Sequence, residues 1–234
     1  MVVDLVNIGI GRRCLWPYIL ISVNQSRLTH GGFIIKGQRI MANLHFFYGM
    51  AGTDIAAKLI QDRHEFLKRY NDVWVLQHKD GETSDKKITS QTGLECPAHT
   101  LSQIKWQDII RRREFYYGAI MINNIHLYKP ADIDNLVKLA DTYSRMILCY
   151  GLMTDPTEHL YPASKHLLEV GAKLHEIPCV CQMLGCNNHA THSLVYHRLG
   201  YVIKNPKTSD VAEAERRYKS VCRICYDRES RNKR

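Results

Sequence analysis

The chain has 234 residues, of which 45% are hydrophobic and 24% are charged. This length and composition exclude the disordered and fibrous classes and predict one globular domain with a small appendage. The net charge of +9 first suggests a nucleic-acid-binding protein. However, residues 1–40 and 219–234 each contribute +4, so the segment between them carries only +1. Because the basic residues lie in the two tails, we expect no specific nucleic-acid partner.

Residues 1–40 differ in character from the rest of the chain. Arg12 and Arg13 precede an apolar run that superficially resembles a signal peptide, but the run is short and contains Pro17. It is also too short to span a membrane, so we expect no membrane partner. Met41 leads directly into the first predicted strand. We therefore expect a poorly packed extension, or an incorrect start at Met1 with Met41 as the true start.

From Met41 onward, strand patterns alternate with helical patterns. Strands are expected at 44–48, 72–78, 117–123 and 145–151, and helices at 54–70, 101–115, 130–143 and 164–174. The polar segment 79–95 is predicted to be a loop. This alternation predicts an α/β domain at 41–177, with a parallel sheet flanked by helices. Ligands of such sheets bind at the carboxyl ends of the strands, so we expect site residues after Tyr48, Ile122 and Tyr150.

The segment NLHFFYGMAGTDIAAKLI at 43–60 has the strand, glycine turn and helix of a phosphate-binding loop, which makes the domain P-loop-like. The residues expected to meet a nucleotide in this loop are Met50, Gly52, Thr53 and Asp54. Where such a loop has Lys followed by Ser or Thr, this chain has Thr53 and Asp54. Thr53 brings no positive charge to the phosphates, and Asp54 brings a negative one. Asp54 is also placed to cap the helix, and Lys58 is expected to point away from the loop.

Five of the eight cysteines lie in the last third of the chain. The expected zinc ligands are Cys181, Cys186, Cys222 and Cys225, with Cys179 in reserve. Four thiolates from two short cysteine-bearing segments, the knuckles at 181–186 and 222–225, make a closed structural zinc site. We therefore predict one zinc per chain in a domain at 178–226, followed by a basic tail at 227–234. The alternative is that these are free buried thiols. Such clustering suits metal binding in a reducing compartment better than a scattered disulfide framework.

A P-loop-like start, an α/β core and a terminal zinc ribbon together resemble the thymidine kinase family of the cellular, bacterial and phage type. The similar stretches are TSQTGLECPAH at 89–99, the segment beginning CYGLMTDP at 149–177, and RRYKSVCRICY at 216–226. The resemblance implies ATP with magnesium, a zinc-ribbon lasso domain that closes over thymidine, and transfer of the γ-phosphate to give dTMP for DNA synthesis. It also implies cytoplasmic dimers or tetramers.

The resemblance places further site residues, several of which depart from the family pattern. Asn123 stands where the family has a magnesium-side aspartate, and Asn124 where it has the general-base glutamate. An amide cannot take the proton of a sugar hydroxyl at neutral pH. His126 falls at a glutamine position, and is either a substitute base or a surface histidine.

The substrate-binding positions implied by the resemblance are Asp155, His192, Ser193 and Tyr218. Asp155 is followed by Pro156 and Thr157 in place of Phe-Arg, which removes a cationic contact to phosphate. His192 and Ser193 replace a phenylalanine and a threonine.

We therefore predict a thymidine kinase family protein whose catalytic motifs are eroded and whose activity is weak or lost. One alternative is a non-catalytic nucleoside- or nucleotide-binding regulatory subunit, either a homo-oligomer or the partner of an active homologue. The other is a zinc-stabilised structural protein with no ligand.

Overall fold

The computed structural model describes residues 43–69, 73–78, 87–100, 119–143, 146–203 and 216–231. The chain divides into two compact units, Met1–Gln38 and Arg39–Arg234, and the described residues all belong to the second. The expected extension at 1–40 and the expected helix at 101–115 therefore lie outside the described residues.

The centre of the fold is a six-stranded sheet with the order β5-β2-β6-β7-β1-β8. Its strands are β1 (Leu44–Gly49), β2 (Val73–Gln77), β5 (His99–Thr100), β6 (Ala119–Asn123), β7 (Met146–Leu152) and β8 (Lys173–Glu176). Every neighbouring pair is parallel, which confirms the predicted parallel sheet. Apolar residues fill the inner strands because a parallel sheet is buried on both faces; all five residues of β6 are buried.

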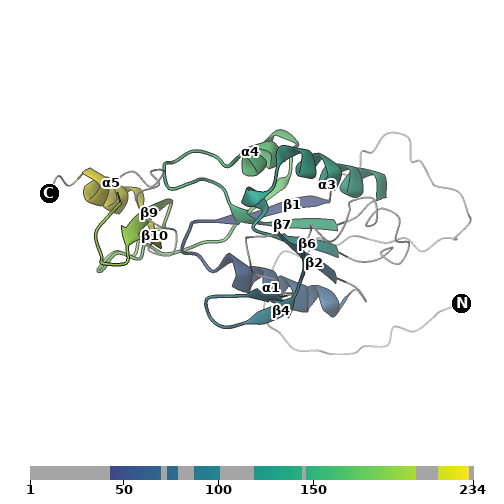
Figure 1. Cartoon of the computed structure of the whole chain (residues 1–234), viewed down its shortest axis with the longest axis horizontal. Coiled ribbons are helices and arrows are strands. Elements are labelled where there is room, and N and C mark those ends of the chain that lie inside the picture. The colour runs from purple at the N-terminus through teal and green to yellow at the C-terminus, as the bar shows by residue number, and fades with distance from the viewer. Residues whose placement is uncertain are drawn as a thin grey trace, which may run out of the picture. The chain divides into compact units, whose positions relative to one another are not determined.

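Helices cover both faces of this sheet (Figure 1). Helices α3 (Pro130–Tyr143) and α4 (Pro162–Glu169) pack on one face, where Leu136 and Leu167 are fully buried in one core cluster. Helix α1 (Ile55–Leu67) covers the other face and buries Leu59 in a second cluster. The 3₁₀ turn η3 (Ile125–Leu127) follows β6 directly.

The predicted loop at 79–95 is wrong over its described part. Strands β3 (Lys87–Thr89) and β4 (Glu95–Pro97) pair antiparallel there as a hairpin. Each strand buries only its middle residue, Ile88 or Cys96, against the α1 side of the core. Three-residue strands with polar ends have too little apolar alternation to be distinguished from a loop.

The predicted helix at 164–174 is also wrong at its C-terminal end. Helix α4 ends at Glu169, and the chain then turns through Gly171, whose φ is +76°. A glycine in this left-handed conformation is a common helix terminator. The residues beyond it form β8, which pairs with β1 at the edge of the sheet.

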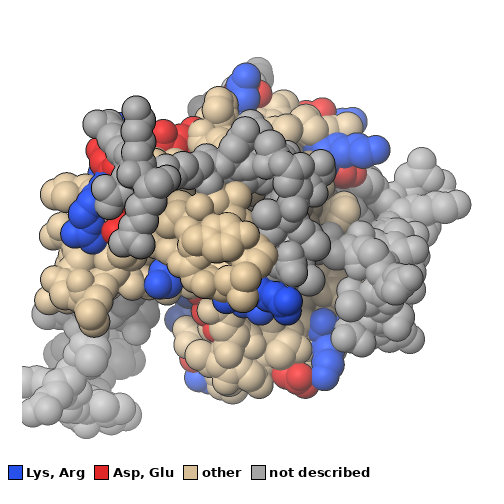
Figure 2. Space-filling view, turned by 60° about the vertical axis from the view of Figure 1, so that its left-hand side comes forward, with Lys and Arg blue, Asp and Glu red and all other residues tan. Residues whose placement is uncertain are grey.

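The C-terminal part consists of the antiparallel pair β9 (His192–His197) and β10 (Arg216–Val221), followed by α5 (Arg223–Arg231). Residues 227–231 of the expected basic tail belong to α5. On the face shown in Figure 2, basic and acidic side chains are interspersed over the described residues. No helix in the described ranges is long and apolar enough to cross a membrane.

Candidate functional site

A pocket of about 540 Å³ lies beside the loop after β1 and the segment after β6. Among the predicted site residues, its lining includes Gly52, Thr53, Asp54, Asn123, Asn124, His126 and Tyr218. The residues that follow β1 and β6 meet at the carboxyl ends of the parallel strands, and Tyr218 joins them from β10. Asp155, His192 and Ser193 instead line an adjoining cavity of about 110 Å³.

The loop between β1 and α1 is closed by its own backbone and by the C-terminal strands. Thr53 N donates to Met50 O at 2.9 Å, and Gly52 has a φ of +105°. Ala51 N donates to Ser193 Oγ at 3.0 Å, and Ser220 Oγ donates to Ala51 O at 3.1 Å. The Thr53 hydroxyl oxygen is buried and has no hydrogen-bond partner among the described residues.

Asp54 caps helix α1, as the sequence predicts. Its Oδ1 accepts the backbone N–H of Ala57 at 3.1 Å, and its Oδ2 accepts the N–H of Thr92 at 3.2 Å. The amino end of a helix carries partial positive charge and free N–H groups, which is why phosphates bind there. In this chain a carboxylate already lies at that position.

Lys58 forms its ion pair away from the loop. Its Nζ lies 2.5 Å from Asp62 Oδ1, one turn further along α1, and 5.5 Å from the centre of the Phe47 ring. Asp62 also accepts the Tyr150 hydroxyl at 2.8 Å. These contacts agree with the expected orientation of Lys58.

The segment after β6 supplies uncharged polar groups to the pocket. Asn123 is buried, and Asn124 has a left-handed φ of 51°. His126 Nδ1 accepts the N–H of Leu152 at 3.1 Å, and its ring centre lies 4.8 Å from that of Tyr161. A neutral imidazole that accepts through Nδ1 carries its proton on Nε2.

Asp155 organises a tight turn. Its Oδ1 accepts the backbone N–H groups of Thr157 and His159, at 2.8 and 3.0 Å. This turn meets the C-terminal part through two contacts: His192 Nε2 lies 2.8 Å from Glu158 Oε1, and the Tyr226 hydroxyl donates to Pro156 O at 3.3 Å.

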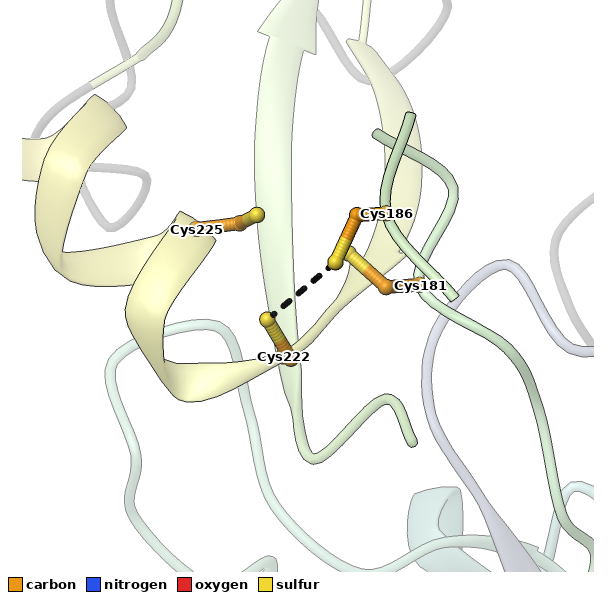
Figure 3. A group of neighbouring side chains, drawn as sticks. All are labelled: Cys181, Cys186, Cys222 and Cys225. Atoms are coloured by element: carbon orange, nitrogen blue, oxygen red, sulfur yellow. Dashed lines mark hydrogen bonds between the residues drawn. The ribbon is translucent and has the colours of Figure 1, made fainter. Parts of the chain in front are cut away.

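The four predicted zinc ligands converge on one point (Figure 3). Cys181, Cys186, Cys222 and Cys225 place their sulfur atoms within 4.8 Å of one another. The sulfurs of Cys186 and Cys222 are 3.8 Å apart. Tetrahedral zinc with Zn–S bonds of about 2.3 Å separates its sulfurs by about 3.8 Å, so the thiols fit this metal. Cys179, the reserve ligand, does not belong to the group.

A metal requires the charged form of its thiol ligands, and the surroundings favour that form at Cys222 but not at Cys225, whose pKa burial raises to about 12. The backbone N–H of Cys225 and the side chain of Asn188 lower the pKa of Cys222 to about 6. Asn188 Nδ2 lies 3.7 Å from the Cys222 sulfur, and Arg228 Nη2 lies 3.8 Å from that of Cys225. Donors around the ligands are typical of metal sites in which thiolates are stabilised and oriented.

Several residues that contribute hydrogen bonds to the site were not identified from the sequence. They include Thr92, whose N–H donates to Asp54, Ser220, whose hydroxyl donates to Ala51 O, and Gln182, whose Oε1 accepts the Ser220 N–H. Serine, threonine and glutamine are frequent on protein surfaces, so their identity alone carries no signal of a site.

Comparison with known proteins agrees with the geometry. The family model described as thymidine kinase matches residues 42–226. The chain is similar to thymidine kinase of Photorhabdus laumondii, with 28% identity over 80% of this chain and 92% of that protein. It is 29% identical to thymidine kinase of Zymomonas mobilis, over 78% of this chain and 95% of that protein. It is 28% identical to thymidine kinase of Enterobacteria phage T4, over 78% of this chain and 94% of that protein.

Proposed function

Because this chain belongs to the thymidine kinase family, we propose that it retains the family's nucleoside pocket and that its phosphoryl transfer is weak or lost. The reaction of the family converts ATP and thymidine to ADP and dTMP. The observation that carries the proposal is the Asp54 carboxylate at the amino end of α1, bonded to Ala57 and Thr92.

Asp54 opposes phosphate binding in two ways. Its Oδ1 takes the Ala57 N–H, one of the groups at the helix end that would otherwise bind an anion. Its charge also repels the phosphates of ATP, at a place where an active loop supplies a lysine. Thr53, at that lysine position, contributes a hydroxyl with no charge.

The other polar groups in the pocket do not compensate. Among the described lining residues Asp54 is the only acidic side chain, and none is Lys or Arg. Asn123 and Asn124 are neutral amides, which bind magnesium more weakly than carboxylates and cannot act as a general base. The described residues therefore do not fit a magnesium-bound triphosphate. Since phosphoryl transfer depends mainly on positioning and charge stabilisation, the combined loss lowers the rate by orders of magnitude.

His126 is a poor substitute base in the observed geometry. Its Nδ1 already accepts the Leu152 N–H. The neutral ring consequently holds its proton at Nε2, and it could accept a substrate proton only by giving up the bond from Leu152, either to free Nδ1 or to move the ring proton there. We propose that His126 positions the end of β7.

Zinc has a structural role in this proposal. Four cysteine ligands leave no open coordination position for a substrate, so the metal would fasten the segments that carry Cys181–Cys186 and Cys222–Cys225. The reducing compartment in which such thiols stay unoxidised, the cytoplasm, is where we place the protein.

A turnover assay tests the loss of activity. Purified protein with ATP, magnesium and thymidine should form no dTMP above background. The triple variant Thr53→Lys, Asp54→Ser and Asn124→Glu restores the lysine, hydroxyl and base, and should raise the rate. A matched control, Thr53→Gln, Asp54→Ser and Asn124→Gln, changes the same positions without the new charges and should stay inactive. Robust dTMP formation by the unmodified protein would refute the proposal.

The retained pocket favours a ligand-binding role over a purely structural one. A ligand that binds only the folded state raises the melting temperature by mass action. Thermal shifts with thymidine, dTTP and ATP should therefore show a response to the nucleoside that exceeds the response to ATP. Co-purification with an active homologue would support the regulatory-subunit alternative, in which the chain occupies one position of a dimer or tetramer.

A further inference from the structure

One residue of the loop after β1 is held at both its backbone groups by two serines. Ala51 N donates to Ser193 Oγ at 3.0 Å, and Ser220 Oγ donates to Ala51 O at 3.1 Å. Ser193 and Ser220 are direct partners in the β9–β10 pairing. Both are buried, with exposed fractions of 7% and 0%. We call this arrangement the serine clamp: Ser193 and Ser220 around Ala51.

The serine clamp also explains a glycine in the loop. Gly52 has a φ of +105°, a conformation that other residues rarely adopt. A Cβ atom at Gly52 would lie 3.1 Å from Ser220 Oγ and 3.2 Å from Ser220 N. The close approach of β10 therefore requires glycine here, whether or not the loop binds phosphate.

The serine clamp is joined to the cysteine cluster by Gln182. Gln182 N donates to Ser220 O, and Ser220 N donates to Gln182 Oε1, both at 2.9 Å. Gln182 follows Cys181, and Ser220 precedes Cys222 by two residues. The paired hydrogen bonds thus link two segments that each continue directly into a zinc ligand, one from each knuckle.

We propose that zinc controls the pocket loop through the serine clamp. A metal bound by Cys181 and Cys222 fixes Gln182 and Ser220 relative to each other, so that both serines stay in place around Ala51. Without the metal, nothing among the described residues ties the segment that carries Cys181 to the segment that carries Cys222 at this point except the hydrogen bonds of Gln182. The part of β9 and β10 that carries Ser193 and Ser220 then moves. Ala51 and Gly52, which line the pocket, are no longer held by the two serines. This inference does not depend on whether the pocket transfers phosphate.

Hydrogen exchange on the full chain tests the inference, with equimolar zinc and after removal of zinc by a chelator. Removing zinc should speed amide exchange at Ala51 by about tenfold or more, because this amide is then no longer held by Ser193. Exchange in α3 (Pro130–Tyr143), which lies on the opposite face of the sheet from α1, should stay unchanged.

Variants separate the serine clamp from general loosening. In the zinc-loaded double variant Ser193→Ala and Ser220→Ala, exchange at Ala51 should already be fast, and zinc removal should add little. The single variant Ser193→Thr, with Ser220 unchanged, keeps a hydroxyl at this position, so its exchange at Ala51 should be as slow as in the unmodified chain. The matched control is Lys219→Ala: Lys219 is exposed and adjacent to Ser220 on β10. This control should respond to zinc as the unmodified chain does.

Two results would overturn the inference. One is zinc removal that speeds exchange around the cysteines but leaves Ala51 unchanged. The other is a zinc-loaded double serine variant that exchanges at Ala51 as slowly as the unmodified chain. If zinc removal unfolds the whole chain, α3 will exchange rapidly as well, and the comparison of the zinc-loaded variants alone then decides.

Discussion

Asp54 and Thr92 are 38 residues apart in the chain, yet the Thr92 backbone N–H donates to Asp54 Oδ2 at 3.2 Å. The other carboxylate oxygen of Asp54 accepts the N–H of Ala57. One side chain thus starts helix α1 and fastens it to the turn between β3 and β4. The residue that opposes phosphate binding in our proposal is therefore also a structural residue.

Replacing Asp54 should reveal this structural role. Asp54→Ala removes both hydrogen bonds, and we expect the free energy of unfolding to fall by about 1–2 kcal/mol, as for other helix caps. Asp54→Ser keeps a capping oxygen but is too short to reach Thr92 as well, so its loss should be smaller. Urea denaturation of the two variants measures the difference. Equal stability of Asp54→Ala and the unmodified chain would show that the cap contributes nothing.

The elements that could be predicted from the sequence are those whose signal is local. The Asp54 cap sits directly before its helix, and β6 is a continuous apolar run. The β3–β4 hairpin was missed because its two strands have only three residues each. The end of α4 was missed because an apolar periodicity continues past Gly171 into an edge strand.

The features of the candidate site also differ in whether a local sequence pattern predicts them. The cysteine cluster was predictable because Cys222 and Cys225 have the spacing of a metal-binding motif. The serine clamp was not, because its hydrogen bonds join residues that are 142 and 169 positions apart. Only the folded chain brings Ala51 between Ser193 and Ser220: Ser193 was named only as a substrate-binding position, and no local pattern marks Ser220.

Gly151 should not tolerate a side chain, for a reason that involves the pocket. A Cβ atom there would lie 2.9 Å from both His126 Nδ1 and Ile125 Cγ2, and 3.1 Å from Ile125 N. We expect Gly151→Ala to lower the free energy of unfolding by about 1–3 kcal/mol, as for other overpacked sites. Adding His126→Ala should recover part of the loss but not all, because Ile125 remains. Thermal denaturation of both variants gives the measurement, and full recovery would mean that Ile125 can move aside.

His166 should make stability depend on pH. Its Nε2 lies 2.8 Å from Asp134 Oδ1 on α3, and its Nδ1 lies 3.1 Å from Glu169 Oε2 on α4. The hydrogen bonds to Asp134 and then to Glu169 raise the pKa of His166 above its ordinary value of 6.5. Because the folded state holds the proton more tightly, the stabilisation is complete below about pH 6.5 and is lost as the pH rises through the raised pKa.

His166→Gln tests this dependence. The variant should lose more stability at about pH 5.5 than at about pH 8.5, by less than about 1 kcal/mol because the carboxylates are exposed. Lys165→Gln is the matched control: Lys165 also pairs with Glu169, at 3.8 Å, but carries no imidazole. Its effect should be the same at both pH values. A loss for His166→Gln that does not change with pH would assign the residue a packing role alone.

Metal content should depend on the four clustered cysteines and not on Cys179. We expect about one zinc per chain in the purified protein, because four thiolates complete one tetrahedral site. Cys222→Ser should lose the metal, since serine does not supply a thiolate ligand. Cys179→Ser should keep it, because the Cys179 sulfur donates to the carbonyl oxygen of Val180 and stands outside the cluster. Elemental analysis of both variants measures this, and zinc loss from Cys179→Ser would show that the ligand set differs from the one in Figure 3.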